Sequence, residues 1–142
     1  MKLFFAGSIR GGTDDLEIYA EIVKLLSRYG RVHSDHMGDS LNPAVGSETS
    51  NQEIYQRDLA ALAQADVVIA EITQPSLGVG YQIGRAEGQG TPVLALYRNL
   101  PDRHVSAMMT GNPHITVDTY TNLADVERIL DQFIGTWGQE DA

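Results

Sequence analysis

The feature that most constrains the fold is a regular alternation of short apolar runs with longer segments of helical periodicity. The clearest run, residues 66–70 (DVVIA), is continuous and β-branched, which is typical of a strand buried on both faces. Four further runs predict strands at residues 2–6, 31–34, 91–97 and 114–117. Strands that alternate with helices form a parallel sheet. The sequence therefore predicts an α/β fold with a five-stranded parallel sheet and helices on both faces.

The segments between these runs predict the helices. The first helix follows the initial glycine-rich turn, and Gly30 is expected to end it as a C′ glycine. The second begins at Ser50 or Asn51, either of which suits an N-cap. The remaining helices are expected at residues 81–88, stopped by Gly90, and at residues 102–110 and 122–134. Residues 35–50 predict a long loop, residues 73–80 a Pro/Gly loop, and the tail from Gly135 a frayed end.

Composition narrows the class of protein. A chain of 142 residues suits one domain spanning residues 1–142, and the absence of cysteine excludes disulfides, thiolate metal sites and a cysteine nucleophile. The formal net charge of −9 disfavours nucleic acid as a partner, because that binding rests on neutralising phosphates. No apolar run approaches the roughly 20 residues that span a membrane. The first apolar run leads directly into Gly7 and reads as a strand, so we expect a cytoplasmic protein without a membrane partner.

Two glycine-bearing segments follow strand ends, where ligands bind in parallel sheets. Residues 7–12 (GSIRGG) combine glycines with the Ser8 hydroxyl and with Arg10, a donor suited to phosphate. Residues 73–86 repeat this logic with Ser76, Gly78 and a helix start. Each segment also fits an ordinary turn between a strand and a helix. If both are functional, they can hold one phosphate from two sides.

The titratable side chains offer one further candidate. Asp58 lies on the second helix, one turn after Ile54, and either occupies a pocket or is an ordinary solvated helix residue. The histidines His33 and His36 stand at an edge between a strand and a loop, where they can line a site, but a surface role is expected. No pair of histidines has the spacing of a zinc-binding helix, so we expect neither a metal nor a cofactor.

Taken together, the segments FAGSIRGG, QRDL, ADVVIAEITQPSLGVGYQIGRA and HVSAMM resemble the 2′-deoxynucleoside 5′-monophosphate N-hydrolases, which are relatives of the nucleoside 2-deoxyribosyltransferases. The resemblance runs from Leu3 to the last helix. It implies a flavodoxin-like (Rossmann-like) fold, a homodimer, and hydrolysis of the N-glycosidic bond of a nucleoside 5′-monophosphate. The products implied are a free base and a sugar 5-phosphate.

The resemblance also implies roles by position. Two sets of residues match phosphate-binding loops: Gly7, Ser8, Ile9, Arg10 and Gly11 in the first, and Ser76 and Gly78 in the second. Ser106 matches a serine that reaches the phosphate in the partner subunit's site. Asp58 matches an acidic residue that assists catalysis near the sugar and base, and Ile54 matches a residue of the base pocket.

Two positions depart from the family pattern. Gln82 stands where the family has a nucleophilic Glu, and a neutral amide neither attacks C1′ well nor balances an oxocarbenium-like transition state. Loss of a nucleophile can cost roughly six orders of magnitude in rate. Phe4 stands where enzymes that prefer deoxyribose carry Tyr, so the choice between ribose and deoxyribose stays open. The alternatives are a protein that binds nucleotides without cleaving them, and a deoxyribosyltransferase, for which two phosphate loops have no use.

Overall fold

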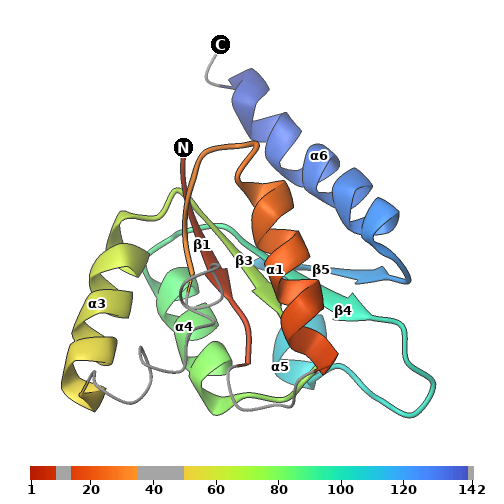
Figure 1. Cartoon of the computed structure of the whole chain (residues 1–142), viewed down its shortest axis with the longest axis horizontal. Helices are drawn as coiled ribbons and strands as arrows, with labels where there is room; N and C mark the ends of the chain where they lie inside the picture. The colour runs from red at the N-terminus through yellow and green to blue at the C-terminus, as the bar shows by residue number, and fades with distance from the viewer. Residues whose placement is uncertain (9–13, 35–49, 141–142) are drawn as a thin grey trace.

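The computed structural model describes residues 1–8, 14–34 and 50–140, and it contains a five-stranded parallel sheet (Figure 1). The strands are β1 (Lys2–Ala6), β2 (Arg31–His33), β3 (Val67–Glu71), β4 (Val93–Arg98) and β5 (Ile115–Tyr120). Their order across the sheet is β2-β1-β3-β4-β5, and every neighbouring pair is parallel. This is the flavodoxin-like order of a doubly wound sheet, so the predicted fold class is confirmed.

Helices cover both faces of the sheet (Figure 1). On one face, α1 (Asp14–Leu26) and α6 (Leu123–Glu140) pack against side chains such as Leu3 and Phe5. On the other, α3 (Asn51–Gln64) and α4 (Leu77–Gly88) pack against Phe4 and Ala6. Successive residues of β1 therefore enter different cores, as the alternation of side chains along a strand requires. The central strand β3 is buried along its whole length.

The structure moves several element boundaries that the sequence predicted. Helix α4 begins at Leu77 rather than at residue 81, because the Ser76 hydroxyl caps it by accepting a hydrogen bond from the Val79 N–H at 3.3 Å. The short helix α5 (Ala107–Thr110) begins only after its own cap, Ser106, so residues 102–106 are not helical. Helix α6 continues to Glu140 because no proline interrupts it and its two glycines, Gly135 and Gly138, cost only about 1 kcal/mol each. The second helix begins after Ser50, one of the two predicted caps.

Glycine is required at positions 90 and 30 for different structural reasons. Gly90 ends α4 as predicted, with φ +81°, and the Gly90 and Thr91 N–H groups donate to the carbonyls of Glu87 and Ala86, which is a Schellman motif. Gly30 is not the predicted C′ glycine, because α1 ends at Leu26 and the φ of Gly30 is not positive. Instead, a Cβ at Gly30 would lie 2.1 Å from the carbonyl oxygen of Met1. Position 30 therefore requires glycine because its backbone lies directly against the backbone of Met1.

Candidate functional site

A cavity of about 760 Å³ opens at the carboxyl edge of the sheet, between the ends of β1 and β3. From β1 the chain crosses to β2 on one side of the sheet, whereas β3 lies on the other side of β1. This is the switch point at which doubly wound sheets bind their ligands. The walls come from the end of β1, from α3 and from the beginning of α4.

Eight of the predicted site residues line this cavity together: Phe4, Gly7, Ser8, Ile54, Asp58, Ser76, Gly78 and Gln82. The predicted residues Ile9, Arg10 and Gly11 lie outside the described residues. The structure does not bring Ser106 into the cavity. Its hydroxyl accepts a hydrogen bond from the Met108 N–H at 3.2 Å, and its side chain is exposed.

One end of the cavity is suited to an anion. Leu77 and Gly78 are the first two residues of α4, so their N–H groups have no acceptor in the helix itself. The partial positive charge of a helix N-terminus favours an anionic group there. A Cβ at Gly78 would meet only the Ser76 hydroxyl, at 4.0 Å, so the cavity side of this glycine is open. Gly7 and the buried Ser8 face the same cavity from the end of β1.

Asp58 is buried, with 6% of its surface exposed, so it is not the solvated helix residue that is the commoner case. Its Oδ1 atom lies 3.1 Å from Nε2 of His33, and the Arg57 guanidinium lies on the same oxygen at 3.4 Å. The other acidic side chains of the described ranges do not line the cavity. Asp58 is therefore the carboxylate available to a ligand in this part of the structure.

His33 contacts two residues of the cavity, although it does not line the cavity itself. Strands β1 and β2 pair in a register that sets Phe4 beside His33, and their rings stack with centroids 5.3 Å apart. His33 thus lies between Phe4, which lines the cavity, and Asp58 on α3, while its own side chain stays 30% exposed. The pairing of two strands that are distant in sequence creates this contact, and no local pattern announces it.

Gln82 is half-buried on α4, and its side chain lines the cavity while the next residue, Ile83, packs into the core. Two nearby carboxylates do not replace the missing Glu. Glu71 has no exposed surface, and Glu87 accepts a hydrogen bond from Asn112 at 2.6 Å on another side of the helix. The chemistry expected at position 82 therefore depends on an amide.

Aromatic and aliphatic side chains form the opposite wall of the cavity. The Tyr55 and Tyr81 rings, from α3 and α4, lie 6.5 Å apart with an interplanar angle of 47°. Ile54 and Leu59 extend this wall along α3. The surface is suited to a flat, largely apolar group such as a nucleobase.

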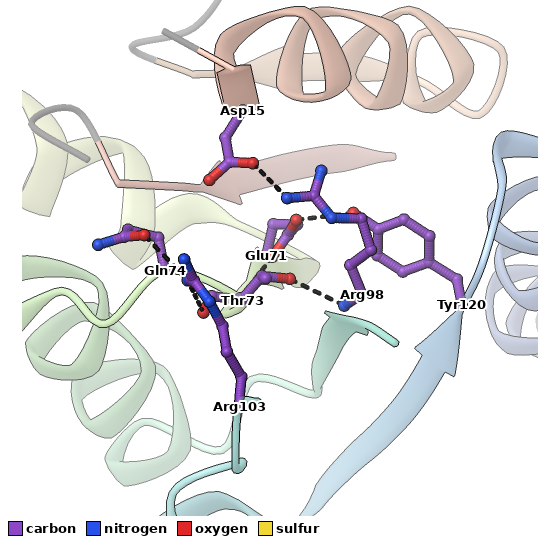
Figure 2. A network of polar contacts seen from close by, with 7 residues as sticks. All are labelled: Asp15, Glu71, Thr73, Gln74, Arg98, Arg103 and Tyr120. Atoms are coloured by element: carbon purple, nitrogen blue, oxygen red, sulfur yellow. Dashed lines mark hydrogen bonds and ion pairs between the residues drawn. The ribbon is translucent and has the colours of Figure 1, made fainter. Parts of the chain in front are cut away.

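A network of polar side chains joins the carboxyl ends of β3, β4 and β5 to the first turn of α1 (Figure 2). This buried network consists of Asp15, Glu71, Thr73, Arg98 and Tyr120. The Glu71 carboxylate accepts hydrogen bonds from the Thr73 N–H at 2.6 Å and from the Tyr120 hydroxyl at 2.7 Å. Arg98 donates its backbone N–H to the Thr73 hydroxyl and its guanidinium to Asp15 at 2.6 Å. Burial raises the pKa of the Glu71 carboxyl, and the pKa of Tyr120 is raised by burial and by the Glu71 charge.

A doubly wound sheet, a cavity at its switch point and a helix start at that cavity are typical of the α/β proteins that bind small anionic ligands. Comparison with known proteins makes this class specific. The family model described as nucleoside 2-deoxyribosyltransferase matches residues 3–122, and the chain belongs to this family. The family resemblance predicted from the sequence is thereby confirmed.

Individual relatives agree with this assignment. The chain is 45% identical over 137 residues to the 5-hydroxymethyl-dUMP N-hydrolase of Rattus norvegicus, covering 93% of this chain and 83% of the relative. It is 41% identical over 140 residues to the protein of the same name from Danio rerio, covering 96% and 97%. The solved structure of the CMP N-glycosidase BcmB from Clostridium botulinum shares the fold, with a TM-score of 0.66 at 17% identity, covering 94% of this chain and 99% of that one.

Two structural findings bear on other classes of site. Among residues 1–8, 14–34 and 50–140, no three or more His, Asp or Glu side chains are grouped to hold a metal ion. Within the same ranges, the helices are too short or too polar to cross a membrane.

Proposed function

We propose that this chain binds a nucleoside 5′-monophosphate in the cavity and is built to cleave the bond between base and sugar. The observation that carries the proposal is that one cavity unites a helix N-terminus, a carboxylate and an aromatic wall. Relatives named 5-hydroxymethyl-dUMP N-hydrolase support it, because their name describes this bond cleavage. Two phosphate-binding segments also favour a nucleotide over the uncharged nucleoside that a deoxyribosyltransferase uses.

The geometry favours one orientation of the substrate. The 5′-phosphate lies between Gly7 and Ser8, directly after β1, and the first N–H groups of α4. The base lies against Tyr55 and Ile54, and the sugar lies between the phosphate and the base. This orientation directs C1′ toward Asp58 and the side chain at position 82.

The reaction needs a carboxylate at position 82. Its oxygen would bond to C1′ as the bond from C1′ to the base nitrogen breaks, with the base leaving as it takes up a proton. Water would then hydrolyse the glycosyl ester and release the sugar 5-phosphate. Gln82 carries no charge and is a poor nucleophile, so the chain as it stands binds substrate but cleaves it very slowly or not at all. Asp58 is the residue placed to assist the departing base.

The proposal includes a homodimer in which Ser106 contacts the phosphate in the partner subunit's site. Two exposed apolar side chains support an interface near this end of the molecule: Leu77, 94% exposed at the start of α4, and Met108, 76% exposed in α5 next to Ser106. It also includes a cytoplasmic location, where free nucleoside monophosphates are available. Sedimentation velocity tests the dimer, and a monomer at micromolar concentration would contradict it.

Base release tests the chemistry. The parent chain and a Gln82→Glu variant are incubated with dGMP, dCMP, GMP and CMP, and free base is followed by chromatography. Release by the Glu variant alone supports a hydrolase silenced at position 82. Binding without release by either chain supports a nucleotide-binding protein, and exchange between a nucleoside and an added base supports a transferase. A Phe4→Tyr change in the active background is expected to shift preference toward the deoxyribonucleotides.

A further inference from the structure

Glu71 is a buried carboxylate for which the proposed chemistry has no use. It ends β3, has no exposed surface, and does not line the cavity. Burying a charge is costly unless it is well hydrogen-bonded, and here both oxygens are. Its partners are the backbone of Thr73 and the hydroxyl of Tyr120, which ends β5. Because Glu71 bonds to the backbone directly after β3, its role is expected to concern the conformation of that segment.

Thr73 is held at three of its polar groups. Its N–H donates to Glu71 at 2.6 Å, its hydroxyl accepts from the Arg98 N–H at 2.8 Å, and its carbonyl accepts from the Arg103 guanidinium at 3.1 Å. The same guanidinium also donates to the side chain of Gln74, which lines the cavity (Figure 2). Because Ser76 caps α4 only three residues later, these contacts fix where the N-terminus of α4 begins.

The network also reaches the segment after β1. The Arg98 guanidinium pairs with Asp15, which lies in the first turn of α1 (Figure 2). One turn further along α1, Tyr19 packs edge-on against Phe5 of β1. The hydroxyl of Tyr19 is buried close to the backbone of Ser8, which lines the cavity. Arg98 therefore connects α1, which packs against β1, to the segment after β3 through its side chain and its own backbone.

We propose that the buried network is a positioning device that holds Gly7 and Ser8, directly after β1, and the start of α4 at the spacing needed to bind one 5′-phosphate. Glu71, Thr73 and Tyr120 act as positioning residues on the α4 side, and Asp15 acts on the β1 side. None of them touches the ligand. The inference rests on the proposed function, because the ligand is the phosphate group of a nucleotide.

Two pairs of variants test the proposal. Tyr120→Phe removes a tyrosine hydroxyl bonded to Glu71. Tyr29→Phe removes one bonded to Asp131, next to the same hydrophobic core but just beyond the end of α1 and outside the cavity lining. Thr73→Val removes the acceptor for the Arg98 N–H, and Thr73→Ser keeps it. Calorimetry measures the affinity of each variant for GMP and dGMP, and for guanosine as the probe without phosphate.

Tyr120→Phe and Thr73→Val are expected to weaken binding of the nucleotides by roughly tenfold, since small displacements of binding groups are costly. Their affinity for guanosine is expected to stay unchanged, and Thr73→Ser and Tyr29→Phe are expected to bind like the parent. A loss that is equal for nucleotide and nucleoside, or that Tyr29→Phe shows as well, would mean a general effect of stability and would overturn the proposal.

Amide hydrogen exchange of the ligand-free chain provides a second readout. Tyr120→Phe is expected to speed exchange both at residues 7–8 and at residues 74–78, whereas Tyr29→Phe leaves both segments unchanged. A change confined to residues 74–78 would show that the network does not connect the two segments, and this result would refute the proposal. If the parent binds no nucleotide at all, the proposed function fails, and the exchange data still decide whether the network couples the segments.

Discussion

Replacing Gly78 by alanine separates the stability of α4 from its proposed contact with phosphate. Gly78 is the second residue of the helix, and an added Cβ would meet only the Ser76 hydroxyl, at an ordinary contact distance of 4.0 Å. Alanine is about 0.5 to 1 kcal/mol more favourable than glycine within a helix. The free chain is therefore expected to gain up to this amount, which corresponds to a rise in Tm of about 2 to 4 °C.

Binding of the nucleotide is expected to change in the opposite direction. Gly78 lines the cavity, so its new methyl group would occupy the space in which a phosphate oxygen approaches the N–H groups of the first turn. A hydrogen bond to a charged group contributes about 1.5 to 3 kcal/mol. Losing one such bond weakens affinity by about 10- to 100-fold, since each 1.4 kcal/mol is a factor of ten.

Isothermal titration calorimetry with GMP and dGMP measures the affinity, and thermal denaturation without ligand measures the stability. Gly84→Ala is the matched control, because Gly84 lies in the same helix, has no atom within 4 Å of its added Cβ and does not line the cavity. It is expected to raise Tm without changing affinity. Unchanged nucleotide affinity in Gly78→Ala would refute the placement of phosphate at the start of α4. A lower Tm would refute the steric argument.

Two further predictions concern stability. Gly30→Ala would bring a Cβ to 2.1 Å from the Met1 carbonyl oxygen, so we expect it to lower the free energy of unfolding by about 1 to 3 kcal/mol, and an unchanged urea midpoint would contradict this. Burial raises the pKa of Glu71 above its ordinary value of 4.5, so the folded state favours the protonated acid and loses stability as pH rises through the folded pKa. The unfolding free energy of the parent is therefore expected to fall relative to that of Glu71→Gln above pH 4.5, and urea titrations showing a constant difference would exclude it.

Much of the fold was predictable because strands and helices have different periods. All five strands were located from apolar runs, since a parallel sheet buried on both faces needs continuous hydrophobic segments. The beginning of α4 was not, because Gly78 and Gly80 lower the intrinsic helix propensity of its first turn. Packing of Val79 and Ile83 into the core, together with the Ser76 cap, overrides that propensity.

The site was predictable where its groups are close in sequence and not where the sheet brings them together. Residues 7–8 and 76–78 carry their glycines and hydroxyls in contiguous motifs, and the structure places them on one cavity. His33 gained its place from the pairing of β2 with β1, and Glu71 gained its partners from β5, which is 49 residues further along the chain. Such contacts depend on strand order, which a hydrophobic pattern does not encode.

Position 82 is where the proposed mechanism separates the requirements of the reaction from those of the fold. Glutamine and glutamate have nearly the same shape, and the side chain at 82 is half-buried at the cavity while the core contacts of α4 come from Val79, Ile83 and Ala86. Packing therefore does not distinguish the two residues, and the helix, the sheet and the cavity form with either. The reaction does distinguish them, because only a carboxylate can bond to C1′ and stabilise positive charge there. On the proposed mechanism, one atom at the cavity wall thus decides between a nucleotide-binding protein and a hydrolase, with no consequence for the fold that supports both.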